Sequence, residues 1–105
     1  DVPIKRGTSD KEYLDELQTN LDKLNQVPRD IIFYQAGVDV LGTDGLGHLC
    51  LSRNGVFSRN KMVLDFARKC QSPLVVFMGG GYSKPIEHSV NAFVELFEQC
   101  SKYSL

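Results

Sequence analysis

The stretch that decides the fold is Ile31-Ile32-Phe33-Tyr34-Gln35-Ala36-Gly37-Val38-Asp39, an apolar run that ends in a glycine and then presents a carboxylate. A second run repeats this plan with a tyrosine after its glycines: Leu74-Val75-Val76-Phe77-Met78-Gly79-Gly80-Gly81-Tyr82. Unbroken runs of β-branched and aromatic residues are typical of strands covered on both faces, as in parallel sheets. Asp39 and Tyr82 each follow the end of a strand, which is where open α/β sheets build their sites.

Three helices are expected before, between and after these strands, because apolar residues recur there at steps of three and four. Ser9-Asp10-Lys11-Glu12 has the spacing of a capping box and predicts the start of the first helix, and Pro28 closes it. Ser58 is expected to cap a second helix running to about Gln71, and Ser83 a third. The expected buried faces are Tyr13, Leu14, Leu17, Leu21 and Leu24 in the first helix, Met62, Val63, Phe66 and Ala67 in the second, and Ile86, Val90, Phe93, Val94 and Phe97 in the third.

The expected order of elements is therefore α-β-α-β-α, and the fold class is α/β. A strand, a crossing helix and a second strand lay the two strands parallel, with their carboxyl ends on the same edge. Asp39 and Tyr82 then become neighbours. Because both strands are apolar on both faces, further strands and helices are expected to cover them, so the chain reads as a slice of a larger domain.

Composition restricts the class of protein. The 105 residues are 42% hydrophobic and 24% charged, as in an ordinary globular unit. Twelve basic and thirteen acidic residues leave a net charge of -1, so no basic stripe indicates nucleic acid. No apolar stretch approaches the roughly 20 residues of a membrane span, and an intracellular address is expected. Three cysteines, odd in number and far apart, are expected to be reduced and mostly buried: Cys50, Cys70 and Cys100.

The polar residues at the strand ends leave several uses open. Asp39 could bind a cation such as Zn²⁺, serve as a base, or satisfy loop N–H groups in an Asx turn. The Gly79–Gly81 loop could cradle an anion, although it lacks the Lys-Ser/Thr of a P-loop. It could instead let the main chain approach a narrow substrate while Tyr82 donates its phenolic O–H. His48 and His88 are expected to be loop or surface histidines, although His48 could lie at a pocket rim and contact substrate.

Two motifs, at residues 36–47 and 79–83, resemble those of the histone deacetylase family, including its bacterial and acetylpolyamine relatives. The resemblance extends upstream through Val2-Pro3-Ile4, Gly7-Thr8 and Glu12-Tyr13-Leu14, so it covers nearly the whole chain. The wording Glu-Tyr-Leu-Asp and Tyr-Gln-Ala-Gly-Val-Asp is most similar to the class IV branch. The resemblance implies a zinc-dependent hydrolase of acyl-lysine amides, with a role in chromatin regulation, built on an arginase/deacetylase-type parallel sheet.

The resemblance also implies a role for each matching residue. Asp39 falls on the last of the family's zinc ligands, which are two aspartates and one histidine. Tyr82 falls on the tyrosine that polarises the amide carbonyl. The other matches are Leu46 with the wall of the acyl-lysine channel, Gly80 and Gly81 with its floor, and Asp44 with a second aspartate that is not a ligand. The segment Thr43-Asp44-Gly45-Leu46-Gly47 departs from the family's usual Gly-Asp-Pro-Leu-Gly or Gly-Asp-Arg-Leu-Gly, which bears on channel width.

The family's paired general-base histidines and its Asp-x-His ligands belong to sequence N-terminal to this chain. Residues 1–105 are therefore expected to be the C-terminal fragment of a single deacetylase catalytic domain, inactive alone, with a complete zinc site only in the full-length protein. The expected partners are an acyl-lysine protein substrate such as histone tails, the missing N-terminal part of the domain, and a second copy through exposed sheet edges. No direct contact with nucleic acid or membrane is expected, and the expected location is the nucleus, the cytoplasm or both.

A reading from another class of protein stays open beside this one. The chain could be a small non-enzymatic α/β binding module that uses the Gly79–Gly81 loop for a nucleotide or a protein partner. The presence of zinc and deacylase activity in the longer gene product would discriminate the two.

Overall fold

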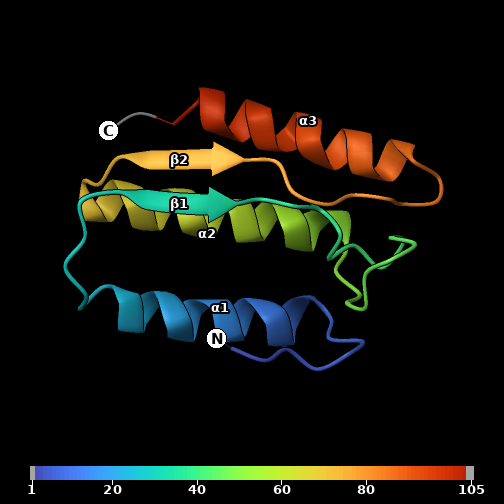
Figure 1. Ribbon diagram of the computed structural model, residues 1–105, viewed down its shortest axis with the longest axis horizontal. Helices are drawn as coiled ribbons and strands as arrows, with labels where there is room; N and C mark the ends of the chain where they lie inside the picture. The colour runs from blue at the N-terminus through green and yellow to red at the C-terminus, as the bar shows by residue number, and fades with distance from the viewer. Residues whose placement is uncertain (1, 104–105) are drawn as a thin grey trace.

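The fold has the expected order of elements. The computed structural model describes residues 2–103, and Figure 1 shows its helices and strands. They are α1 (Asp10–Leu24), β1 (Ile32–Gln35), α2 (Arg53–Cys70), β2 (Leu74–Phe77) and α3 (Glu87–Ser101). The order α-β-α-β-α and the α/β class predicted from the sequence are confirmed. In the part of the chain that the structure describes, no helix is both long and apolar enough to cross a membrane.

The two strands pair in parallel, with Ile32 opposite Leu74 and Gln35 opposite Phe77. Backbone hydrogen bonding continues past the strand ends. The N–H of Ala36 donates to the carbonyl of Phe77 at 2.9 Å, and the N–H of Val38 donates to the carbonyl of Gly80 at 2.7 Å. Both glycine turns therefore begin side by side at the carboxyl edge, as the β-α-β reading requires.

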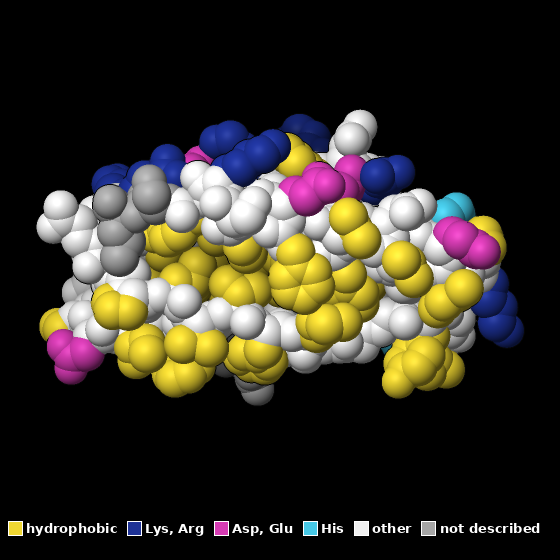
Figure 2. All heavy atoms as spheres, turned by 90° about the horizontal axis from the view of Figure 1, so that it is seen from above, with side chains coloured by type: hydrophobic (Ala, Val, Ile, Leu, Met, Phe, Trp, Pro, Cys, Tyr) yellow, Lys and Arg dark blue, Asp and Glu magenta, His cyan; other side chains and the backbone are white. Residues whose placement is uncertain are grey.

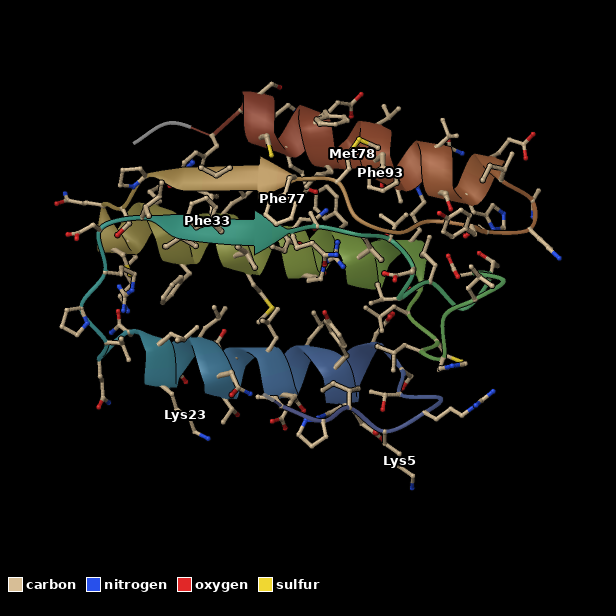
Figure 3. The ribbon with its side chains drawn as sticks, viewed as in Figure 1. Lys5, Lys23, Phe33, Phe77, Met78 and Phe93 are labelled. Carbon is tan, nitrogen blue, oxygen red and sulfur yellow. The ribbon has the colours of Figure 1, made fainter. Side chains whose placement is uncertain are left out.

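Helices α2 and α3 cover one face of the sheet, and α1 packs against α2 (Figure 1). The core beneath that face joins Tyr34 and Ala36 to Val63 of α2 and Leu96 of α3. Residues of a strand alternate between faces, so the other face carries Phe33, Val75 and Phe77, all of which are exposed. Figure 3 labels Phe33 and Phe77 on the two strands. The sequence predicts that both faces of the sheet are covered. Within the described residues, only the face that packs against α2 and α3 is covered.

Helix α2 begins at Arg53, so the predicted start at Ser58 is wrong. Ser52 is the N-cap, and its Oγ accepts the N–H of Gly55 at 3.0 Å. The N–H of Ser52 donates in turn to the carboxylate of Asp10 at 2.8 Å. A Cβ on Gly55 would clash with that same carboxylate. In the sequence Gly55 looks like a loop residue, but it lies in the first turn of α2. A glycine is needed there because the Asp10 carboxylate at the start of α1 leaves no room for a side chain.

Helix α1 starts where the sequence predicts, with Ser9 at its N-cap, but the side-chain capping bonds predicted for Ser9 and Ser83 do not form. Ser9 occupies the N-cap position of α1 but makes no side-chain capping bond, so the capping box with Glu12 does not form. Helix α3 begins at Glu87, and its N-cap position is Ile86 rather than Ser83. Ser83 is buried instead, and its N–H donates to the Oγ of Ser89 at 3.0 Å. Ser83 therefore joins the segment that precedes α3 to the side of the helix and does not cap the helix N-terminus.

The predicted buried face of α3 is largely wrong. Helix α3 turns the face of Ser89, Ala92 and Leu96 inward, and the glycine turn after β2 comes close to this helix. A Cβ on Gly81 would lie 2.7 Å from Cγ2 of Val38 and 3.0 Å from Cε2 of Phe93. The buried residues are Ser89, Ala92 and Leu96, with Phe93 half-buried, whereas Ile86, Val90, Val94 and Phe97 are exposed. Figure 2, seen from the α3 side, shows hydrophobic side chains running along much of the molecule.

The faces of the other helices agree better with the sequence. Val63 and Ala67 of α2 are buried as predicted, whereas Met62 and Phe66 are half-buried. In α1 only Leu21 is buried, with Leu24 exposed and the remaining predicted residues half-buried. The three cysteines are unpaired, but the prediction that most are buried is wrong: Cys50 is exposed, and Cys70 and Cys100 are half-buried.

We expect Leu96→Ala to lower the free energy of unfolding by about 2–5 kcal/mol, because Leu96 is 0% exposed and its loss leaves a cavity between α3 and the sheet. Urea denaturation followed by circular dichroism measures this change. Phe97→Ala on the same helix is the matched control, since Phe97 is 54% exposed. An equal loss in both variants would show that the inward face of α3 is assigned incorrectly.

Candidate site at the carboxyl edge

Asp39 lies in the loop that follows β1, with its side chain exposed. Its carboxylate lies over the two glycine turns. A Cβ on Gly80 would come within 3.0 Å of Oδ2, and a Cβ on Gly37 within 3.2 Å of Oδ1. These two glycines therefore leave space that the carboxylate occupies. Among the hydrogen bonds formed by residues 2–103, none uses the carboxylate of Asp39.

Asp44, in the same loop, is used in the opposite way. Its Oδ1 accepts the N–H groups of Leu46 at 2.8 Å and Gly47 at 2.7 Å, and its Oδ2 accepts the N–H of Tyr82 at 2.6 Å. Partial burial raises the pKa of Asp44, but these three N–H donors outweigh it and hold the pKa below its ordinary value. Asp44 is thus the residue that forms the Asx turn, and it joins the loop after β1 to the loop after β2.

The main chain of Tyr82 is held on both sides while its side chain remains 59% exposed. Its N–H donates to Asp44, and its carbonyl accepts the N–H of Gly45 at 2.9 Å. A third backbone bond nearby joins the N–H of Lys84 to the carbonyl of Thr43 at 2.9 Å. The two loops therefore form one connected unit that fixes the start of the tyrosine side chain.

The remaining predicted site residues lie on these same loops. Leu46 is exposed and follows Asp44 by two residues. Gly80 lies beneath the Asp39 carboxylate, and Gly81 packs between Val38 and Phe93. Gly47 is a site residue that was not predicted from the sequence. A Cβ at this position would clash with the carbonyl of Asp39, so the position requires glycine. Loop closure onto Asp39 thus depends on a glycine that the sequence shows only as one of several.

The two histidines are exposed, as predicted. His88 contacts Thr43, with 3.1 Å between Nδ1 and Oγ1, whereas the main-chain carbonyl of His48 accepts the N–H of Gly7 at 2.7 Å. Within residues 2–103, no three His, Cys, Asp or Glu side chains form a group that could hold a metal ion. Catalytic zinc takes three protein ligands. The donors present therefore fit one ligand of such a site, Asp39, and not a complete set.

Sequence reasoning also missed a buried arginine below this edge. Arg59 lies on α2, is 4% exposed, and donates to the carbonyl of Gly37 at 2.7 Å. Its signal in the sequence is its spacing, because Arg59, Val63 and Ala67 recur at steps of four and share one face of the helix. A charged residue on a face that is otherwise apolar and buried indicates a specific partner.

These features define a parallel α/β unit with an open carboxylate and an exposed phenol at the carboxyl edge of its strands, the place where such folds carry ligand and active sites. Comparison with known proteins agrees with this class. The model of the histone deacetylase domain family matches residues 1–97. The chain belongs to the histone deacetylase family.

Relatives from several organisms match over most of this chain. An uncharacterised protein of Picosynechococcus sp. is 37% identical over 91 residues, which is 86% of this chain and 30% of that protein. Histone deacetylase 2 of Arabidopsis thaliana is 34% identical over 105 residues, 99% of this chain and 26% of that protein. Histone deacetylase clr6 of Schizosaccharomyces pombe is 30% identical over 83 residues, 78% of this chain and 20% of that protein. The chain therefore spans less than a third of the length of each of these relatives.

A solved structure supports the fold independently. The crystal structure of an acetylpolyamine aminohydrolase from Burkholderia pseudomallei matches with a TM-score of 0.74 at 19% identity. The match covers 92% of this chain and 28% of that one. The predicted arginase/deacetylase-type fold is thereby confirmed.

We expect Asp44→Asn to lower the free energy of unfolding at pH 7 by about 1 kcal/mol, because an amide cannot accept the N–H of Tyr82 through its nitrogen. The folded-state pKa of Asp44 lies below its ordinary value of 3.8. The carboxylate therefore stabilises the fold above that value, and the stabilisation is lost as the pH falls through the lower, folded-state pKa. Thermal unfolding at pH 7 and in acid should show the difference between parent and variant shrinking in acid.

Asp39→Asn is the matched control for that measurement, since the Asp39 carboxylate accepts no hydrogen bond from the described residues. It should leave unfolding at pH 7 nearly unchanged. If Asp39→Asn destabilised the fold as much as Asp44→Asn, the division of roles between the two aspartates would be wrong.

Proposed function

We propose that this chain is the C-terminal part of the catalytic domain of a zinc-dependent lysine deacylase, which hydrolyses the amide of acyl-lysine. Membership of the histone deacetylase family supports the reaction class. The observation that carries the proposal is the contrast between two aspartates of one loop. Asp44 is occupied by three backbone N–H groups, whereas Asp39 is open to a ligand. A carboxylate left open at the carboxyl edge of a parallel sheet is well placed to bind a cation.

Asp39 would hold zinc as one of three protein ligands. The other ligands and the general base would come from elsewhere in the whole protein, so the fragment alone would be inactive. When bound, zinc supplies Lewis-acid polarisation of the scissile carbonyl. Glycines at positions 37 and 80 leave the Asp39 carboxylate unobstructed by side chains.

Tyr82 would donate its phenolic O–H to the carbonyl oxygen, where negative charge develops during hydrolysis. A donor of this kind is effective when it is already oriented before the reaction. Asp44 and Gly45 hold the main chain of Tyr82 on its two sides, which limits how far the phenol can drift. The main chain of Tyr82 is therefore held in place, whereas its phenol group remains exposed.

Leu46 would form part of the wall of a channel for the aliphatic stem of the substrate lysine, because its apolar side chain is exposed beside the site. Gly80 and Gly81 would form the floor, where the absence of side chains lets a narrow substrate come close. The proposed substrate is acyl-lysine on a protein such as a histone tail, consistent with a role in chromatin regulation in the nucleus or cytoplasm. A matching structure is named an acetylpolyamine aminohydrolase, so an acetylated polyamine is the substrate to test beside it.

The exposed apolar face of the sheet supports a further part of the proposal. Phe33, Val75 and Phe77 face away from the helices, and contiguous apolar surface of this kind marks an interface. The rest of the same catalytic domain would cover it in the whole protein. In its absence, self-association through the sheet edges would be the alternative.

The geometry does not favour a nucleotide-binding module. An anion-binding glycine loop offers its N–H groups at the start of a helix. Here the Asp39 carboxylate lies over Gly80, and Asp44 already accepts the N–H of Tyr82. Two carboxylates beside the loop would repel a phosphate, and α3 begins only at Glu87, another acidic residue.

In the full-length protein, we expect Tyr82→Phe to retain zinc and to lose turnover by a factor on the order of 10²–10³, because one oxyanion donor is removed. Deacylation of an acetyl-lysine peptide and elemental analysis for zinc measure the two properties. Tyr103→Phe is the matched control, since the Tyr103 hydroxyl is buried and has no hydrogen-bond partner in the described structure. Parental turnover in Tyr82→Phe would contradict its assigned role.

Removal of the Asp39 carboxylate should affect the metal directly. We expect Asp39→Ala in the full-length protein to weaken zinc binding by more than about 100-fold, because a ligand is lost rather than a residue behind it. Competition with a zinc chelator gives the affinity. Asp65→Ala, an exposed carboxylate that pairs with Lys61 on α2, is the control and should bind zinc as the parent does. Unchanged zinc binding in Asp39→Ala would exclude it as a ligand.

A further inference from the structure

Arg59 is a buried cation without an anionic partner among the residues that the structure describes. Its guanidinium donates to the carbonyl of Gly37 at 2.7 Å and to that of Ala36 at 3.4 Å. It also donates to Oδ1 of Asn60, from Nη2 at 3.1 Å and from Nε at 3.3 Å. None of the ion pairs formed by residues 2–103 includes it. The charge is therefore balanced by dipoles and by the ring of Tyr34, which lies 5.6 Å from the guanidinium carbon.

The two carbonyls explain why a multiple donor is useful at this position. Ala36 and Gly37 follow the last residue of β1 and are both buried. Their carbonyls can no longer all be paired by the sheet, and a buried carbonyl without a donor is costly. A guanidinium presents five N–H donors in a fixed planar fork. Arg59 thus serves both carbonyls from a single position on α2.

The guanidinium is itself held in place by a buried polar network. The hydroxyl of Tyr34 donates to Oδ1 of Asn60 at 2.5 Å, and Nδ2 of Asn60 donates to Oε1 of Gln99 at 3.0 Å. Nε2 of Gln99 in turn donates to the carbonyl of Phe57 at 3.0 Å. Burial raises the pKa of Tyr34 to about 12, although the nearby positive charge of Arg59 acts to lower this pKa. The hydroxyl therefore keeps its proton and acts as a donor at neutral pH. The network joins β1, α2 and α3 and leaves Arg59 one orientation.

Arg59 reaches Asp39 through the peptide that it holds. The Asp39 carboxylate packs against Gly37, whose Cβ, if present, would lie 3.2 Å from Oδ1. Between them, Val38 is 0% exposed, and its N–H is bound to the carbonyl of Gly80. Arg59 therefore holds the buried main chain at Ala36 and Gly37, and the exposed side chain of Asp39 belongs to the same turn. A shift of the Gly37 carbonyl would move the carboxylate with it.

We propose that Arg59 is a positioning residue for the metal site: its guanidinium fixes the Ala36–Gly37 carbonyls so that the Asp39 carboxylate is oriented before the metal binds. This inference rests on the proposed function, in which Asp39 is a ligand. An arginine that served stability alone could be replaced by an apolar residue of similar volume with little effect on the metal. An arginine that orients a ligand cannot, because partners behind a ligand typically carry 10–100-fold of metal affinity.

The test uses the full-length protein with Co²⁺ in place of zinc, because the visible spectrum of cobalt reports ligand geometry. We expect Arg59→Met to weaken Co²⁺ binding by about 10–100-fold and to change the spectrum. Arg59→Lys keeps the charge but loses the fork, and should weaken binding by a smaller factor, about threefold or more. Chelator competition and titration of the metal-free protein provide both readouts without any activity measurement.

Two controls separate positioning from stability. Arg53→Met removes an exposed arginine of the same helix, paired with Glu95, and should leave Co²⁺ affinity and spectrum unchanged. Leu96→Ala destabilises the core without touching Gly37 and should also bind Co²⁺ as the parent does. If Arg59→Met behaves like Leu96→Ala, with a lowered unfolding temperature and parental metal binding, the inference is overturned.

The remaining outcomes are also decisive. Should Arg59→Met fail to fold, Arg59→Lys decides, and parental affinity and spectrum in that variant would overturn the positioning role. A parent protein that binds neither zinc nor Co²⁺ would overturn the proposed function itself. Loss of binding in Asp39→Ala together with parental binding in both Arg59 variants would sustain the proposed function and reject the role of Arg59.

Discussion

The parallel pairing of β1 with β2 is the constraint on which the site depends, because it ends both strands at one edge. The backbone ladder runs on beyond the strands, from Ala36 to Phe77 and from Val38 to Gly80. Asp44 then joins the two loops through the N–H of Tyr82. Each step requires the one before it, since only strands in this register bring their glycine turns within reach of a single carboxylate.

The same constraint explains why the interior beneath the edge is polar. A strand that stops inside a protein leaves carbonyls that the sheet no longer pairs, and buried carbonyls need donors. Arg59 supplies them for Ala36 and Gly37, and Asn60 together with Tyr34 holds Arg59. The polar network costs desolvation of a charge. In return, Arg59 holds the carbonyls of Ala36 and Gly37 in the turn that leads directly to Asp39.

Much of the fold could be predicted from the sequence, because the signals for it are local. Two unbroken apolar runs and three helical periods gave the order of elements, and the β-α-β rule brought Asp39 and Tyr82 to one edge. The start of α2 could not be predicted, because the N-cap residue Ser52 is held by a hydrogen bond to Asp10, forty-two residues away in the sequence. The use of each aspartate was equally hidden: Asp39 and Asp44 share a loop, and only the folded main chain decides which one receives the N–H groups.

The buried face of α3 was hidden for a related reason. This helix has two faces on which residues recur at helical spacing, and hydrophobicity alone favours the face of Val90, Val94 and Phe97. The buried face is instead the one that meets the sheet and the loop after β1, because Ala92 packs in one cluster with Val38 and Leu41, and Leu96 in another with Tyr34 and Ala36. Val90, Val94 and Phe97 are left exposed, and Figure 2 shows hydrophobic side chains along much of the molecule on the α3 side. The buried face of α3 is thus decided by contacts with residues far away in the sequence, which the hydrophobic periodicity of the helix itself does not contain.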